Sequence, residues 1–266
     1  MHLIPDAPTS FRVTPLNRFT MGGRWRTEAM RSYRQPLLLW FTRGQGRMTV
    51  SGVTRGFGPH NLVYLPAGTM HGFDSIGQLF GQAVFLANDP ALMLPDDPLH
   101  LRFREASQQG ELNILIDTLN REIDADLPAK DRALMHHAGL ISVWLERQMA
   151  LMPEFEMNPD ASRRLAAAFT ALVEKEFHSG ASIAHYAAEL GVTPTHLSRA
   201  CNVASGRPAS AILADRVHFE ARRMLAETKL PVKDIAQQLG FRSPAYFTRA
   251  FHKVTGVTPS AFRQSR

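Results

Sequence analysis

Apolar residues recur with two different spacings along the chain. In the first half, short apolar runs between glycine-containing turns predict β-strands over residues 37–41, 47–51, 61–65 and 78–86. Helical spacing of apolar residues follows over 111–122 and 130–151. Short strands with glycine turns are typical of a β-barrel or sandwich. We therefore expect an N-terminal β-barrel or sandwich followed by two helices.

A segment with two prolines and several acidic residues, 153–160, fits neither spacing. It predicts a linker between a first domain over 1–152 and a second over 161–266. A length of 266 residues with 44% hydrophobic residues allows each domain a core of ordinary size. The expected fold class is a two-domain α+β protein whose C-terminal domain is all helical.

Within the second domain, the segment 183–191 is repeated at 232–240. In both copies a helical pattern runs up to a glycine, and a second helix restarts at Thr193-Pro194 or Ser243-Pro244. Glycine ends the first helix by adopting a left-handed conformation, and a capping hydroxyl before proline starts the next. Two helices around such a short turn are typical of a helix-turn-helix motif. A second copy at this distance can address a second stretch of the same DNA groove.

Periodicity separates the two faces of the second helix in each copy, with Leu197 and Phe247 on the inner side. The outward positions and the nearby Arg242 form the predicted DNA-contacting set: Thr195, Ser198, Arg199, Asn202, Arg242, Ala245, Thr248, Arg249 and His252. An arginine can pair bidentately with guanine, which contributes about 1–3 kcal/mol of discrimination. The alternative is that these are ordinary solvated positions, which is harder to accept for both copies at once.

Charge is distributed unevenly between the two parts of the chain. Residues 1–160 hold fifteen Lys and Arg against seventeen Asp and Glu, whereas 161–266 hold fifteen against seven. A positive excess of this kind is expected of a domain that neutralises DNA phosphates. A basic membrane-surface domain would instead show an amphipathic helix with bulky apolar residues opposite its lysines, and the sequence contains none.

A longer set of residues surrounds the second repeat: Arg216-Val217, Ala221-Arg222-Arg223-Met224-Leu225-Ala226-Glu227-Thr228, Ile235-Ala236, Leu239-Gly240-Phe241, Tyr246-Phe247-Thr248-Arg249-Ala250-Phe251, Gly256, Thr258-Pro259 and Phe262-Arg263. With these residues, 161–266 resembles the DNA-binding domain of the AraC/XylS family of bacterial transcription regulators. One departure is Phe262, where the family often has tyrosine.

The resemblance implies two helix-turn-helix motifs joined by a long helix over about 209–226. At 1.5 Å per residue such a helix spans roughly 27 Å, close to the roughly 34 Å between successive major-groove faces. The resemblance also implies a transcription regulator, either an activator or a repressor, which forms a homodimer through the helices at about 111–151. A small molecule bound in the N-terminal barrel would then change how the two DNA-binding domains are presented.

The segment Pro66-Ala67-Gly68-Thr69-Met70-His71 resembles a motif of cupin barrels, in the form found in AraC-type effector domains. A metal-binding cupin would also need an earlier histidine pair and a glutamate, and residues 40–59 contain neither histidine nor acid. A single histidine cannot hold a metal that usually needs three or four protein ligands. We therefore expect no metal and no cofactor, but a small organic effector, aromatic or carboxylated, beside Trp40, Tyr64 and His71.

Taken together, the patterns favour a non-enzymatic, sequence-specific DNA-binding transcription regulator. Its predicted partners are double-stranded operator or promoter DNA, the effector, a second copy of the chain and, as a further candidate, RNA polymerase. Two alternatives stay open: a cupin metalloenzyme fused to a DNA-targeting module, and a ligand-independent regulator whose barrel is only a dimerisation scaffold. The single cysteine, Cys201, is expected in the core. The N-terminus lacks a signal-peptide pattern and no apolar stretch approaches membrane length, which predicts a cytoplasmic protein.

Overall fold

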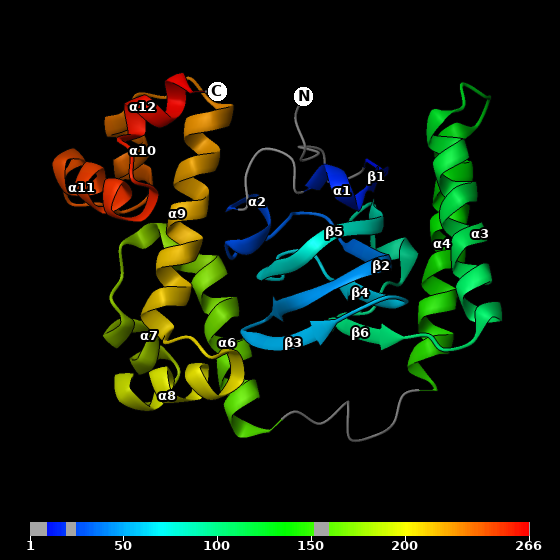
Figure 1. Cartoon of the computed structure of the whole chain (residues 1–266), viewed down its shortest axis with the longest axis horizontal. Coiled ribbons are helices and arrows are strands. Elements are labelled where there is room, and N and C mark those ends of the chain that lie inside the picture. Colours follow the sequence, from blue (N-terminus) through cyan, green and yellow to red (C-terminus); the bar gives the residue numbers. More distant parts are fainter. Residues whose placement is uncertain (1–9, 20–24, 152–159, 266) are drawn as a thin grey trace.

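The computed structural model describes residues 10–19, 25–151 and 160–265. A sheet with two long helices beside it forms the N-terminal part, and shorter helices grouped around one long helix form the C-terminal part (Figure 1). The α+β class expected from the sequence, with a sheet-rich first half and an all-helical second half, is confirmed. Within the described ranges, no helix combines the length and the hydropathy needed to cross a membrane.

Six strands form one antiparallel sheet: β1 (Arg12–Pro15), β2 (Leu37–Val50), β3 (Val53–Phe57), β4 (Asn61–Leu65), β5 (His71–Phe85) and β6 (Leu99–Arg102). Their order in space is β1-β5-β2-β4-β6, and β3 pairs with β2. The predicted strands 37–41 and 47–51 are the two ends of the single long strand β2, and most of 78–86 is the second half of β5.

Strand β2 is long enough to pair with three others. Its first half pairs with β4, its second half with β3, and β5 runs along its whole length. The β2–β5 ladder shifts register between Phe41 and Gln45, where an extra residue bends a strand and increases its twist. Gly44 lies in this bend with φ of 98°, a backbone conformation that side chains with a Cβ rarely adopt.

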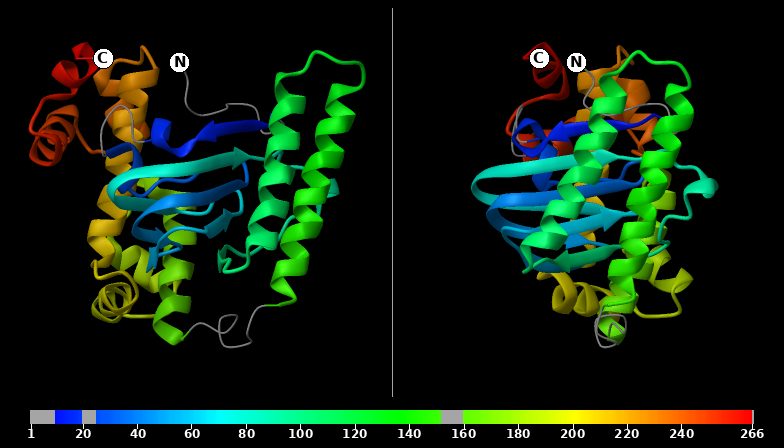
Figure 2. Two further views of the ribbon diagram at one scale, coloured as in Figure 1. Left: turned by 45° about the vertical axis from the view of Figure 1, so that its right-hand side comes forward. Right: turned by 90° about the vertical axis from the view of Figure 1, so that its right-hand side faces the viewer.

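The expected closed barrel is not what the structure shows. Among the described strands, the edge strands β1 and β6 do not pair with each other, so the sheet stays open. A barrel requires every strand to be hydrogen-bonded on both sides with a matched stagger. Helices α3 (Ala106–Asp124) and α4 (Lys130–Met149) instead cover one face of the sheet (Figure 2), so burial of its apolar residues does not require closure. Both helices were predicted from periodicity, and α3 begins earlier than expected.

Alternation along the strands gives the sheet two apolar faces. Leu38, Trp40 and Tyr64 pack in the cluster that includes α3 and α4. Leu39 and Phe41, each one residue away from these, belong to a second cluster on the other face. Neighbouring residues of a strand point to opposite faces, and the helices determine which set lies beneath them.

Short helices complete the N-terminal part: α1 (Leu16–Phe19), α2 (Trp25–Glu28) and the 3-10 turn η1 (Pro90–Leu92). The C-terminal part contains α6 (Ala161–Glu176), the 3-10 turn η2 (Phe177–Ser179), α7 (Ile183–Glu189), α8 (Pro194–Ser205), α9 (Ala209–Glu227), α10 (Val232–Gln238), α11 (Pro244–Thr255) and α12 (Pro259–Gln264). Helix α9 agrees with the connecting helix expected over 209–226.

The sheet-rich part and the helical part share an apolar core. Met30 and Met70, from the first part, are almost fully buried in the same cluster as Ala166 and Phe169 of α6. Apart from Asp160, which caps α6, the predicted linker 153–160 lies outside the described residues. The shared core means that the position of α6 depends on the sheet as well as on the other helices.

Candidate nucleic-acid interface

The first helix-turn-helix unit consists of α7 and α8, and side-chain caps define where both helices begin. Ser182 and Thr193 each accept a hydrogen bond from the backbone N–H three residues later. Pro194 occupies the first turn of α8, where a backbone N–H would have no helical partner. Local sequence therefore determines the start of each helix.

The second unit, α10 and α11, repeats the arrangement with one difference. Ser243 accepts a hydrogen bond from the backbone N–H of Tyr246 and is followed by Pro244, as in the first unit. Helix α10, by contrast, follows Pro231 and has no side-chain cap. The duplicated helix-turn-helix geometry expected from the sequence is present.

The inner faces of α8 and α11 are fully buried, as periodicity predicted. Leu197 and Cys201 serve this role in α8, and Phe247 and Phe251 in α11. Burial raises the pKa of the Cys201 thiol to about 11. The thiol is therefore neutral at physiological pH, and its contribution is to packing rather than to nucleophilic chemistry.

The predicted DNA-contacting residues lie on the outer faces of α8 and α11, except for Arg242, which lies in the turn before α11. Those that are exposed are Thr195, Arg199, Asn202, Arg242, Ala245, Arg249 and His252, and those half-buried are Ser198 and Thr248. The hydroxyl group of Thr248 donates a hydrogen bond to the backbone carbonyl oxygen of Pro244 at 2.9 Å.

A shallow depression of about 730 Å³ runs over the outer face of α8, lined by Pro194, Thr195, Ser198, Arg199, Asn202 and Val203. It gathers all four residues predicted in this helix. Val203, which is 66% exposed, also lines the depression and was not among the predicted residues. Tyr246 of α11 is exposed as well and was not predicted.

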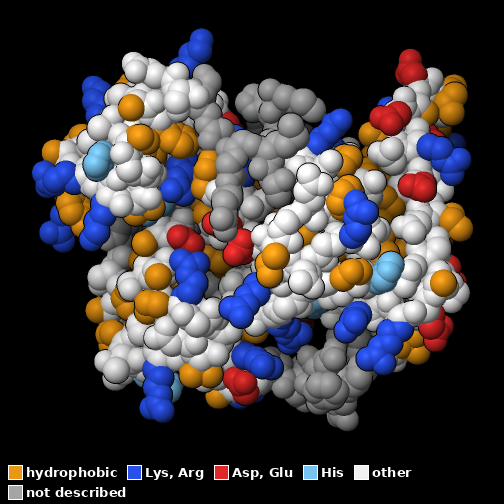
Figure 3. Space-filling view, in the orientation of Figure 1, with side chains coloured by type: hydrophobic (Ala, Val, Ile, Leu, Met, Phe, Trp, Pro, Cys, Tyr) orange, Lys and Arg blue, Asp and Glu red, His pale blue; other side chains and the backbone are white. Residues whose placement is uncertain are grey.

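Helix α11 lies in the helical part at a distance from the sheet, whereas the C-terminal end of α8 contacts β3, where Thr54 donates to the carbonyl oxygen of Ser205 (Figure 1). The space-filling view shows Lys and Arg side chains around the position of α11, with few acidic side chains among them (Figure 3). Helix α11 therefore lies on a positively charged surface.

A family described as a helix-turn-helix domain matches residues 186–265. The C-terminal part is an AraC-type helix-turn-helix domain. The chain is 27% identical over 125 residues to the arabinose operon regulatory protein of Escherichia coli, and the aligned residues cover 47% of this chain and 42% of that protein. It is 33% identical over 95 residues to the uncharacterised HTH-type transcriptional regulator YtdP of Bacillus subtilis, covering 36% of this chain and 12% of the other.

The chain therefore spans less than half the length of these curated relatives. Among solved structures, ToxT from Vibrio cholerae is similar over 96% of this chain and 98% of its own, with 13% identity and a TM-score of 0.44. The family match begins within α7, so the cupin resemblance of the N-terminal part stays a prediction.

Outside the AraC-type domain, the three residues predicted to bind an effector do not converge on one cavity. Trp40 Nε1 donates to Asn113 Oδ1 of α3 at 2.8 Å, and Tyr64 is buried in the same cluster beneath the helices. His71 lies instead against Tyr33, with ring centroids 5.3 Å apart, and Tyr33 belongs to the cluster on the other face. The structure therefore places His71 apart from Trp40 and Tyr64, and effector binding by these residues stays a prediction.

His71 is fully buried, and its environment keeps it neutral. Burial and the charge of Arg31 lower the pKa of His71 to about 3, although its Nδ1 lies 2.9 Å from the carbonyl oxygen of Thr69. Arg31 is itself fully buried, and its Nε donates to the Tyr33 hydroxyl at 3.0 Å. These contacts attach the segment after α2 to the start of β5, where Arg31 and His71 pair as neighbouring strand residues.

A cavity of about 350 Å³ lies where the sheet meets α6 and the end of α4. Its lining comes from both parts of the protein: Met48, Val50, Ser51, Val53, Arg55, Val63, Asp97, Pro98, Leu99, His100, Met149, Arg163 and Ala167. Most of these side chains are apolar, and two of them are cationic. Within the described residues, no group of three or more His, Cys, Asp and Glu is placed to hold a metal ion.

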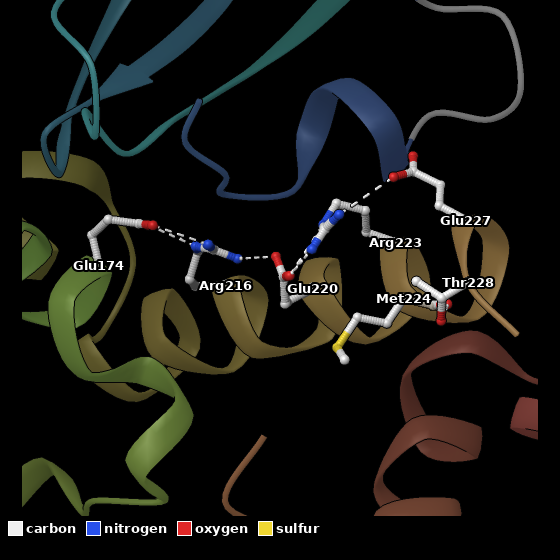
Figure 4. Close-up of polar contacts among 7 residues, drawn as sticks. All are labelled: Glu174, Arg216, Glu220, Arg223, Met224, Glu227 and Thr228. Atoms are coloured by element: carbon white, nitrogen blue, oxygen red, sulfur yellow. Dashed lines mark hydrogen bonds and ion pairs between the residues drawn. The ribbon is translucent and has the colours of Figure 1, made fainter. Parts of the chain in front are cut away.

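A buried arginine of α9, Arg216, connects this helix to α6, the helix before the first helix-turn-helix unit (Figure 4). Both Nε and Nη2 of Arg216 donate to the carboxylate of Glu174 in α6, at 2.6 and 3.0 Å, and Nη1 donates to Glu220 at 3.0 Å. The guanidinium lies 3.8 Å from the centre of the Phe177 ring. Only 6% of the Arg216 side chain is exposed. Glu174 depends on it for charge compensation, whereas Glu220 is paired with Arg223 as well.

The same network determines the pKa of Glu220 in α9. Burial alone would raise the pKa of Glu220, but hydrogen bonds and charge from Arg223 and Arg216 outweigh it and hold the pKa below its ordinary value. A carboxylate with a lowered folded-state pKa stabilises the fold above its unfolded pKa. That contribution is lost as the pH falls through the folded-state value.

We predict that Arg216→Met lowers the free energy of unfolding by about 3–5 kcal/mol at neutral pH, because Glu174 loses the cation it is paired with and Glu220 keeps only Arg223. The deficit should shrink below about pH 4, where protonation removes the uncompensated negative charge. Denaturant unfolding of the full chain across pH measures both effects. Arg207→Met is the control: its 2.8 Å ion pair with Asp215 is about one-third exposed and should contribute below about 1 kcal/mol. Equal losses in the two variants would contradict the prediction.

Proposed function

We propose that this protein is a sequence-specific DNA-binding transcription regulator. The observation that carries the proposal is the pair of exposed outer faces, on α8 and α11, of two helix-turn-helix units of the AraC type. A helix of this motif enters the major groove and reads base edges with its outward side chains. Arg199 and Arg249 are the two side chains best suited to guanine recognition.

The spacing of the two units supports reading of two groove segments by one chain. Helix α9 has 19 residues, about 28 Å at 1.5 Å per residue. Successive faces of a major groove recur about every 34 Å, and the remaining distance can be covered by the reading helices at its two ends. The positive excess of the C-terminal part neutralises phosphates along the same stretch of DNA.

We further propose that a small organic effector occupies the cavity between the sheet and α6. A volume of about 350 Å³ falls within the range of about 300–1,000 Å³ typical of ligand sites. Met48 and Val53 provide apolar walls, while Arg55 and Arg163 favour a ligand with an anionic group. Because the lining includes α6, an occupant would change how the AraC-type domain is held against the sheet. This site replaces the one expected around Trp40.

A homodimer through the outer surface of α3 and α4 completes the proposal. Ile114 on α3 is 66% exposed and Leu140 on α4 is 54% exposed, with Val143 exposed on the same helix. The space-filling view shows hydrophobic side chains on this edge, opposite the AraC-type domain (Figure 3). A division into domains 1–152 and 161–266 fits this arrangement, since dimer contact and DNA contact then lie at opposite ends. We also propose that the regulator contacts RNA polymerase.

The direct test of DNA recognition uses the two arginines. Arg199→Ala or Arg249→Ala should each weaken binding to a site selected from random DNA by about 1–3 kcal/mol and relax base preference at a few positions. Non-specific binding, with its steep dependence on salt, should change little. Electrophoretic shift titrations measure both. Arg104→Ala, an exposed arginine in the sheet-rich part, is the control. Parental affinity in both reading-helix variants would contradict the assignment of these faces.

Occupancy of the cavity can be tested with an apolar organic anion as a probe. Anilinonaphthalene sulfonate should bind the parent saturably, and Ala167→Trp should remove that binding because indole fills the cavity. Arg163→Gln should weaken it through loss of a cation. Ala245→Trp, which adds the same bulk to an exposed position on α11, should leave it intact. Fluorescence titration measures probe binding by the parent and the three variants. Unchanged binding in Ala167→Trp would contradict the proposed site.

Dimerisation can be tested separately from DNA binding. The double variant Ile114→Asp with Leu140→Asp should shift the protein from dimer to monomer at micromolar concentration, because two buried charges would oppose the interface. Sedimentation velocity measures the change. Ile76→Asp, at a residue of β5 that is 74% exposed, should leave the dimer intact. A monomeric parent would contradict the proposed interface.

A further inference from the structure

The two helix-turn-helix units are near copies, yet their turn glycines have different surroundings. Gly191 and Gly240 have φ values of 67° and 73°, and each donates a backbone hydrogen bond of 3.0 Å back into its first helix. A Cβ added to Gly191 would meet no atom within 4 Å, whereas one added to Gly240 would lie 2.7 Å from the Cα of Gly180 and 2.7 Å from the carbonyl oxygen of His178. The same local turn is therefore exposed in one unit and enclosed in the other.

The contact at Gly240 is reciprocal and formed by backbone on both sides. Gly180 lies between η2 and α7, at the entrance of the first unit, and has φ of 71°. A Cβ on Gly180 would overlap the carbonyl oxygen of Gly240. Backbone atoms cannot move aside as the end of a flexible side chain can. A side chain at either position would therefore separate the two units.

Neighbouring residues extend this contact into a rigid junction. Phe177, just before Gly180, packs against the apolar clusters of both units, and the Arg216 guanidinium covers its ring. Helix α9 holds the second unit through Ala221, Met224 and Leu225, which pack in the apolar core of that unit. The contact between Gly180 and Gly240 adds a second point of attachment, which opposes rotation of the second unit relative to the first.

We propose that Gly240, through its backbone contact with Gly180, is a specificity-determining positioning residue: it sets the number of base pairs between the two DNA subsites that one chain accepts. The proposal rests on the function proposed above, in which both α8 and α11 read DNA. One base pair changes the separation of two subsites by about 3.4 Å and their relative rotation by about 35°. A junction closed by backbone contact cannot follow such a change, so one reading helix would lose its base contacts.

The test compares Gly240→Asn with Gly191→Asn in the full chain. Asparagine tolerates the left-handed conformation better than other residues with a Cβ, so both variants keep the turn, and only the first introduces a side chain into the junction. A parental site is selected from random DNA. Derivatives then carry one base pair more or one fewer between the two protected segments, and affinities are measured for every pair of protein and DNA.

We expect the parent and Gly191→Asn to lose at least about tenfold in affinity when the spacing changes by one base pair, as for loss of a base contact. Gly240→Asn should bind the parental spacing at least about tenfold more weakly and either prefer another spacing or discriminate less than about threefold among them. Gly180→Ala places a Cβ in the same contact from the opposite backbone and should give the same spacing profile. If Gly240→Asn does not fold, the Gly180→Ala variant provides the test.

Identical spacing profiles for the Gly240 and Gly191 variants would overturn the positioning role. So would a parent that tolerates spacing changes as well as the variants do. A parent that binds no DNA sequence specifically would contradict the proposed function itself, which keeps the two failures distinguishable. Thermal unfolding of each variant, followed by circular dichroism, verifies that the compared proteins are folded.

Discussion

Arg216 is hydrogen-bonded to Glu174 of α6 and Glu220 of α9 while its guanidinium covers the Phe177 ring, and the geometry of the helical part depends on this cluster. A charge so deeply buried is tolerated only where carboxylates compensate it. Because the cluster connects the helix before the first unit to the helix that leads to the second, it maintains their relative orientation. The Gly180–Gly240 contact lies on the same junction and adds the steric restriction.

The sheet-rich part contacts the helical part at several points, among them a hydrogen bond from Thr54 of β3 to Ser205 of α8 and the two apolar attachments that follow. Met30 and Met70 enter the core around α6, and Trp25 lies within ring contact of Phe219 in α9 and Phe262 in α12, with centroids 5.7 and 6.1 Å apart. Both attachments contact helices that also support the reading helices. The cavity beside α6 lies at the first attachment, so a ligand there would act where the two parts meet rather than deep inside the sheet.

The N-terminal part shows why tertiary structure was harder to predict there. Alternation and turn residues did not reveal β1, β3 and β6, but β4 and parts of β2 and β5 were predicted. Closure was not, because it depends on whether β1 and β6 meet, and no local pattern encodes that. The same limit applies to Trp40 and Phe41: alternation separates them, but only the docking of α3 and α4 determined that Trp40 faces the helices. His71 could not be grouped correctly with Trp40 for that reason.

In the AraC-type domain, the sequence by itself determined the two helix-turn-helix motifs, the residues that cap their helices and the outer faces of α8 and α11. Capping and periodicity act within a few residues, so the information is local and readable. Tertiary structure alone decided the different environments of Gly191 and Gly240, the burial of Arg216 between two carboxylates, and the cavity shared by the sheet and α6. Each of these arises from contacts between segments far apart in the chain. Two glycines with the same local pattern cannot reveal which of them another backbone will approach.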